Sequence, residues 1–179
     1  FAVRFVQGDV AESYRISERA LALSPAYPDA AGQAHFAFGG AASELGRHEL
    51  AIEHFALAHE MTIDQPPALV GTRPEVHSRA WCAHPLWALG RDDEAVHWAD
   101  WAVARAEEVE QPYSLAVALA YAAITHQMRR DVDATRHFAE RTERLVHVRL
   151  HFAPECAIAH VLAVEVLHDH DAGLRCAGA

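Results

Sequence analysis

The sequence contains 14 histidines in 179 residues, and some of them lie at spacings that suit metal binding. His147 and His151 are four residues apart, a spacing that would place two imidazoles on one face of a helix. Two Glu-x-x-His pairs have the carboxylate–histidine spacing of di-iron helix bundles, namely Glu94 with His97 and Glu165 with His168. However, His147 and His151 straddle the expected end of a helix, and no partner glutamate recurs at a matching place on the intervening segments. We therefore predict no metal and no cofactor, and keep a His-ligated metalloprotein as the least favoured alternative.

Candidate nucleophiles are few and poorly placed for catalysis. Cys82 precedes Ala83 on the apolar packing face of an expected helix, where a cysteine is usually a small hydrophobic residue rather than a thiolate. Ser78 lies beside His77, but no acidic residue is evident that would orient this histidine. Ser114 belongs to a Pro-Tyr-Ser segment that is typical of a helix start. We predict no catalytic residues and expect that the chain is not an enzyme.

Composition and charge exclude several further functions. All 15 basic residues are arginine and the chain has neither lysine nor asparagine, which excludes a phosphate-loop lysine and a Schiff base. The formal net charge of −10 repels a phosphate backbone, so we expect no direct nucleic-acid partner. No apolar run approaches the roughly 18 residues of a membrane span. Three cysteines without a C-x-x-C pair indicate a reducing compartment, and we expect a cytoplasmic protein.

An internal repeat organises the sequence. Turn-like dipeptides recur at spacings of 38, 44, 40 and 40 residues, beginning at Gly8, Gly46, Gly90, Arg130 and His170. Small or short residues follow each of the first four by five and by twelve positions: Ser13 and Ala20, Ala51 and Ala58, Ala95 and Ala102, Thr135 and Thr142. Others precede each of the last four by seven positions: Gly39, Ala83, Ala123 and Ala163. Small residues at such places let two helices cross closely, so each repeat is predicted to be a helix hairpin.

Helical periodicity covers most of the chain, and no strand-like alternation competes with it. The expected helices are 1–7 (partial), 10–24, 28–45, 48–63, 73–89, 92–109, 113–129, 132–147 and 154–169. Asp9 and Thr72 each stand three residues before a glutamate at a helix start, which predicts capping there. Pro85 falls inside the 73–89 helix and is expected to bend it near Trp81. The fold class is therefore predicted to be all-α, as a single repeat domain over 1–179.

Two segments resemble tetratricopeptide (TPR) repeats. The segment 8–25 resembles the second helix of such a repeat, including Ala20 five residues before Pro25, and 39–58 resembles the next one. The spacings exceed the roughly 34 residues of the usual repeat, so the resemblance is to a lengthened, divergent TPR-like class. It implies a right-handed α-solenoid of about four to five antiparallel helix hairpins with repeats of 38–44 residues, and a role in protein binding.

A narrower resemblance covers about residues 30–170. The stretches VGTRPEVHSRAW (70–81), WALGR (87–91) and, within 111–131, QPYSLA and HQMRRD resemble the helical-repeat region of large bacterial signalling ATPases, including LuxR-type transcriptional regulators and cyclase-linked predicted ATPases. This resemblance implies a fragment of a longer chain that senses an effector or protein and acts on attached ATPase and output domains. A stand-alone TPR adaptor or scaffold protein is the alternative.

The resemblance to TPR repeats also selects candidate binding residues, because the first helix of each pair lines the concave face of a TPR superhelix. By position these are Gln33, Phe36, Ser43, His77, His84, Trp87, Ile124, Gln127 and His160. The set is aromatic and polar without full charges, which suits a peptide or a small effector, or else packing against a neighbouring domain. The TPR clamp for chaperone tails uses lysine and asparagine, which this chain lacks, and Arg79 in mid-groove would substitute poorly. The solenoid ends, 1–6 and 172–179, offer apolar surface for a homodimer.

Overall fold

The structure is a computed structural model that describes residues 1–63, 65 and 73–149. In these residues the chain forms eight α-helices and two short 3-10 helices, without any strand. They are α1 (Ala2–Val6), α2 (Val10–Leu23), η1 (Ser24–Ala26), η2 (Pro28–Ala30), α3 (Ala31–Glu44), α4 (His48–Thr62), α5 (Pro74–Ala88), α6 (Asp92–Glu108), α7 (Pro112–Met128) and α8 (Val132–Arg149). The predicted all-α fold is confirmed, and the helix predicted at 154–169 lies outside the described residues. None of the described helices is long and apolar enough to cross a membrane.

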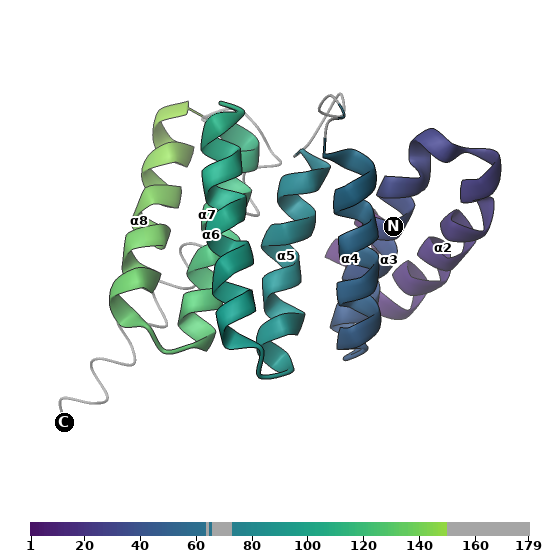
Figure 1. The fold of residues 1–179 in the computed structure, drawn as a ribbon, viewed down its shortest axis with the longest axis horizontal. Coiled ribbons are helices and arrows are strands. Elements are labelled where there is room, and N and C mark those ends of the chain that lie inside the picture. Colours follow the sequence, from purple (N-terminus) through teal and green to yellow (C-terminus); the bar gives the residue numbers. More distant parts are fainter. Residues whose placement is uncertain (64, 66–72, 150–179) are drawn as a thin grey trace.

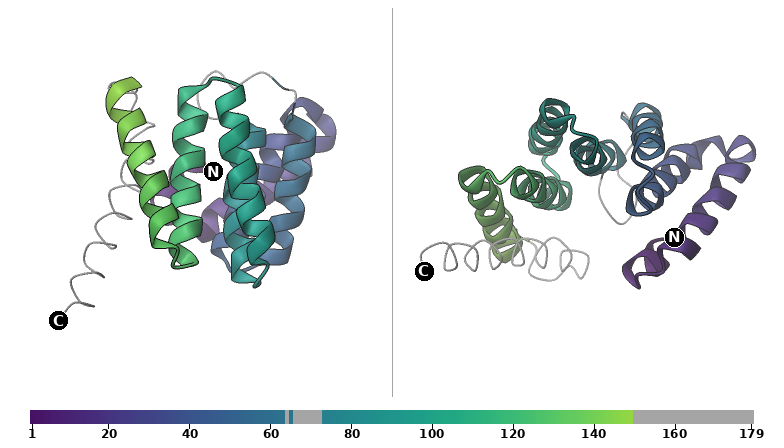
Figure 2. Two further views of the ribbon diagram at one scale, coloured as in Figure 1. Left: turned by 60° about the vertical axis from the view of Figure 1, so that its left-hand side comes forward. Right: turned by 90° about the horizontal axis from the view of Figure 1, so that it is seen from below.

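The helices form antiparallel pairs that stack into a curved solenoid (Figure 1). α3 packs on α4, α5 on α6 and α7 on α8, while α4 with α5 and α6 with α7 join neighbouring pairs. Seen from below, α4 and α6 lie on the outer side of the arc and α5 is set back between them (Figure 2). The first helices also contact one another, α3 with α5 and α5 with α7. They therefore form the concave face, as the resemblance to TPR repeats implies.

Small residues allow the close packing of neighbouring helices. The small or short residues that mark the predicted crossings are buried at Ser13, Gly39, Ala51, Ala58, Ala83, Ala95, Ala102, Ala123, Thr135 and Thr142. Ala20 is only half-buried. A Cβ added at Gly39 would lie 3.1 Å from the Phe55 ring, and one at Gly40 would lie 2.7 Å from the Trp81 ring. Glycine is thus required where α3 meets these two aromatic side chains.

The turns that mark the repeats share one backbone conformation. The angle φ is 78° at Gly8, 72° at Gly46, 73° at Gly90 and 60° at Arg130. In each turn this residue donates its N–H to the carbonyl three residues earlier, and the next residue donates to the carbonyl five residues earlier. This Schellman arrangement ends the first helix of each pair and leads into the second. Arg130 adopts the left-handed conformation without the freedom of glycine, at a cost of roughly 1–2 kcal/mol.

The helix starts agree in part with the predicted caps. The Asp9 carboxylate accepts a hydrogen bond of 3.2 Å from the Glu12 N–H, which confirms the cap of α2. Thr72 lies outside the described residues, and Arg73 precedes α5 without a side-chain capping bond. Instead, the Arg73 N–H donates a hydrogen bond of 2.7 Å to the Ser114 hydroxyl at the start of α7. This bond ties the first turns of two first helices together.

α3 differs locally from its predicted course, and α5 spans its predicted range in one piece. α3 begins at Ala31, three residues later than predicted, because residues 28–30 form a 3-10 turn. α5 continues as one helix through Pro85 to Ala88, and Pro85 is completely buried.

Candidate functional site

The first helices of the solenoid surround a cavity of about 380 Å³ on the concave face, called the groove cavity below. Its lining is Phe1, Ala2, Phe5 and Val6 at α1, Phe36 on α3, His77 and Trp81 on α5, and Tyr113, Val117, Ala120 and Tyr121 on α7. Six of these side chains are aromatic, and none carries a full charge at neutral pH. Such a lining favours apolar and aromatic ligand groups.

Trp81 lies at the centre of this lining. Its ring centroid is 5.2 Å from that of Phe5, 5.7 Å from that of Phe36 and 5.8 Å from that of Tyr121. Gly40 contacts the indole so closely that no larger residue fits there without displacement. The indole is therefore packed against α1, α3 and α7, and only 6% of Trp81 is exposed. A ligand in the groove cavity would meet a preformed wall.

Two histidines of the concave face are neutral at physiological pH. Burial lowers the pKa of His77 to about 4 and that of His84 to about 4. His84 donates from Nε2 to the Tyr121 carbonyl at 3.3 Å, and its ring stacks on the Tyr121 ring at 5.0 Å between centroids. The His77 ring stacks on Trp81 at 5.8 Å. Burial also raises the pKa of Tyr121, so the groove carries polar but uncharged groups.

The structure brings together part of the predicted binding set. Phe36 and His77 line the groove cavity, and His84 stacks on Tyr121 beside it. Gln33 lines a separate cavity of about 320 Å³ between α2 and α3. The half-buried side chains of four further members lie outside the lining of the groove cavity: Ser43, Trp87, Ile124 and Gln127. His160 lies outside the described residues.

Apart from Phe36 and His77, the aromatic residues of the lining were not predicted. Trp81 lies one helical turn from His77, and Val117 and Tyr121 form the same i, i+4 stripe with Tyr113 on α7. These residues could have been predicted by following the helix face that carries His77 in steps of four residues, and then the matching face of α7. The positions chosen on α7, Ile124 and Gln127, instead fall nearer its C-terminal end.

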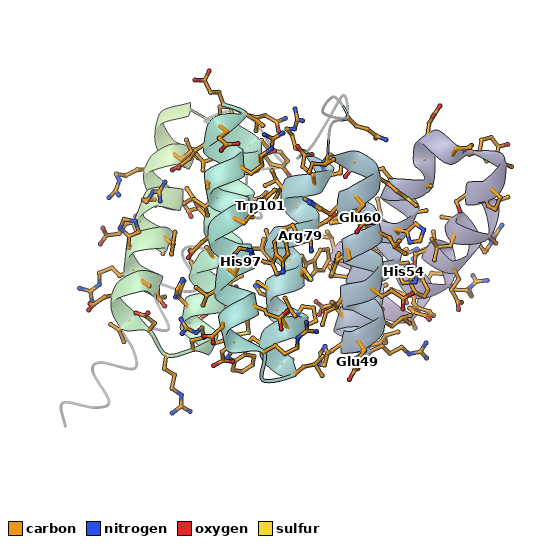
Figure 3. All side chains as sticks on the ribbon, in the orientation of Figure 1. Glu49, His54, Glu60, Arg79, His97 and Trp101 are labelled. Carbon is orange, nitrogen blue, oxygen red and sulfur yellow. The ribbon has the colours of Figure 1, made fainter. Side chains whose placement is uncertain are left out.

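Arg79 lies on the face opposite to the groove, contrary to its predicted place in mid-groove. It follows His77 by two residues, which turns its side chain by about 200° around the helix. Its guanidinium packs over the Trp98 ring of α6, with the guanidinium carbon 3.5 Å from the ring centroid. Figure 3 shows Arg79 with Trp101 and His97 between α4 and α6. Arg79 is therefore remote from any ligand of the groove cavity.

The candidate nucleophiles are structural residues. Cys82 is 1% exposed in the packed core, and burial raises the pKa of its thiol to about 12, as expected for a small hydrophobic residue. Ser114 is completely buried, and its hydroxyl accepts from Arg73 and donates to the Gln111 side chain at the start of α7. Within the described residues no three His, Cys, Asp or Glu side chains converge to hold a metal ion. His151, Glu165 and His168 lie outside those residues.

Comparison with known proteins defines the class of fold. No family model matches the sequence, and no curated protein matches it. Among solved structures the chain is similar to TPR-like helical-repeat proteins, so its fold is a TPR-like α-solenoid. One neighbour is a crystal structure described as a Podosopora anserina putative kinesin light chain with nearly identical TPR-like repeats, and another is a single-substitution variant of that protein. Each has a TM-score of 0.59 and 16% identity over 96% of this chain, and over 90% and 89% of the neighbour, respectively.

Proposed function

We propose that the chain is a non-enzymatic protein-interaction module whose groove cavity binds an aromatic or aliphatic group of a peptide or a small effector. The observation that supports this proposal is the uncharged aromatic cavity to which α1, α3, α5 and α7 all contribute. A cavity of about 380 Å³ is of the size that ligand pockets commonly have. His77 and Tyr113 add polar groups at its wall that can orient a ligand.

The mechanism that we propose is differential binding. Because four successive first helices share one cavity, a ligand that fills it contacts every repeat of the described arc. Such a ligand favours the curvature at which its contacts with all four helices are best. Curvature would then transmit occupancy to whatever is attached at the ends of the solenoid.

The sequence resemblance of 70–131 to the sensor region of bacterial signalling ATPases supports a cytoplasmic role within an ATP-dependent transcriptional or signalling regulator. In that setting the partners are the ATPase and output domains of the parent chain. A stand-alone adaptor, with or without homodimers formed through the solenoid ends, is the second candidate. The sequence of the complete gene product separates the two, because only the regulator carries a phosphate loop upstream of the repeats.

Binding in the groove cavity is tested with a neutral aromatic probe, N-acetyl-tryptophanamide, observed by ligand-detected NMR. Val117→Phe on α7 should fill the cavity and abolish binding, since Val117 lines it. Val132→Phe is the matched control, because Val132 is exposed on α8 and the same group is added there. Circular dichroism confirms that each variant is folded. Equal binding by all three proteins, or no binding by the unmodified protein, would contradict the proposal.

A further inference from the structure

A second cluster of side chains lies on the convex face, over α5 and between α4 and α6 (Figure 3). It comprises His59 of α4, Arg79 of α5, and Trp98 and Trp101 of α6, and is called the convex site below. The His59 and Trp101 rings meet edge to face at 4.9 Å between centroids, and the two tryptophan rings are 6.0 Å apart. The convex site shares no residue with the lining of the groove cavity.

Arg79 is a half-buried cation that makes no ion pair in the described part of the chain. Its Nε is buried there and makes no hydrogen bond. No described carboxylate lies within ion-pair distance of the guanidinium. Trp98 covers one face of the guanidinium at 3.5 Å, and because Nε is buried, the edge formed by the two terminal nitrogens is the part that can meet a ligand.

Three other half-buried arginines of this solenoid pair with carboxylates, whereas half-buried Arg129, whose Nε is also buried without a hydrogen bond, makes no ion pair in the described part of the chain. Arg73 pairs with Glu75 at 2.6 Å, Arg105 pairs with Glu108 at 3.2 Å, and Arg141 pairs with a glutamate of α6. Burial lowers the pKa of Arg79, and a carboxylate at its edge would offset that cost. A carboxylate would therefore neutralise Arg79 in the way that glutamates neutralise Arg73, Arg105 and Arg141.

The surroundings of Arg79 define the kind of anion. His59 is kept neutral, because burial and the charge of Arg79 both lower its pKa, so the convex site offers a single cation. One guanidinium edge matches the two oxygens of one carboxylate. Trp98 and Trp101 are half-buried and present aromatic surface beside it. A carboxylate with apolar or aromatic neighbours fits this combination.

We propose that the convex site binds an aspartate or glutamate side chain of a partner protein, flanked by apolar residues, with Arg79 as the anchor. This inference goes beyond the proposed function, because it assigns a different ligand to the opposite face. Glu60 is the exposed acidic residue close enough to raise the pKa of Arg79, and it lies on α4 at the same place (Figure 3). Its charge opposes an incoming carboxylate, so its removal should strengthen binding.

The test uses two peptide pools of the form acetyl-X-Glu-X-amide and acetyl-X-Gln-X-amide, in which X is Phe, Leu or Tyr. Binding is followed through the indole N–H signals of Trp98 and Trp101 in ¹H–¹⁵N spectra. The Glu pool should shift both signals and bind at least about tenfold more tightly than the Gln pool, the loss expected for a charge-assisted hydrogen bond. Glu60→Gln should raise the affinity of the protein for the Glu pool several-fold.

Arg79→Met keeps an unbranched aliphatic side chain but removes the charge. It should lower the affinity for the Glu pool at least about tenfold, to the affinity for the Gln pool. The comparison of the two pools on the unmodified protein decides the matter even if this variant fails to fold. Equal affinity for the two pools, or unchanged affinity of a folded Arg79→Met protein, would overturn the proposal. Val117→Phe in the groove cavity should leave this binding unchanged, so the two proposals succeed or fail separately.

Discussion

Lowering the pH from 7 to 5 should destabilise the solenoid through two histidines of the concave face. The pKa of His77 and of His84 is lowered from 6.5 to about 4 in the folded chain, because both rings are desolvated. The unfolded chain therefore takes up their protons first as the pH falls. Their contribution to stability is complete above pH 6.5 and is lost progressively between 6.5 and about 4.

The size of the effect follows from these values. Integration of the proton uptake between pH 7 and 5 gives a loss of about 2 kcal/mol in the free energy of unfolding for each of these two histidines. Burial also lowers the pKa of four more histidines, and this adds to the loss of unfolding free energy between pH 7 and 5. They are His35, His54, His59 and His126. A loss of this size is a large fraction of the stability of an ordinary domain.

The assay is urea unfolding followed by circular dichroism at pH 7 and at pH 5. His77→Gln and His84→Gln should each reduce the fall in unfolding free energy between the two pH values by about 2 kcal/mol. His97→Gln, at an exposed position on α6, is the matched control and should leave the fall unchanged. If His77→Gln loses as much stability as the unmodified protein over this range, the desolvation of His77 is refuted.

Two further predictions concern the backbone. Arg130→Gly should raise the free energy of unfolding by about 1 kcal/mol and the melting temperature by roughly 2–4 °C, because Arg130 occupies the left-handed region; a lower melting temperature would show that its side chain outweighs the backbone strain. Gly40→Ala should cost about 1–3 kcal/mol, because its Cβ would press on the Trp81 ring at 2.7 Å. Gly39→Ala, 3.1 Å from Phe55, should cost less in the same urea assay, and the reverse order would contradict the packing described for α3.

The helices and their pairing were predictable because they depend on local and periodic signals. Glycine adopts the left-handed conformation of these turns without strain, so Gly8, Gly46 and Gly90 reveal three of the turns. The turn at Arg130 was predicted from its matching position in the repeat. Buried small residues at fixed offsets, such as Ala51 and Ala58, reveal which face of each helix meets its neighbour. These signals need no knowledge of the curvature of the solenoid.

The groove cavity was predicted only in part because it depends on that curvature. Phe5 of α1 reaches Trp81 of α5, two first helices further along, and no sequence spacing encodes this contact. Arg79 was misplaced for a related reason. A shift of only two residues along a helix turns a side chain from the concave to the convex face. The assignment of Arg79 to a first helix was correct, but the direction of its side chain places it outside the groove.

The hydrogen bond between the Arg73 N–H and the Ser114 hydroxyl has a mechanical consequence. It fixes the separation of α5 and α7 at their N-terminal ends, where both helices begin. A ligand that forces α5 and α7 apart must therefore rotate them away from each other about a hinge at this bond. The largest displacement would occur at the far ends, near Ala88 and Met128. The turns into α6 and α8, rather than the mouth of the groove, would then carry the motion onward.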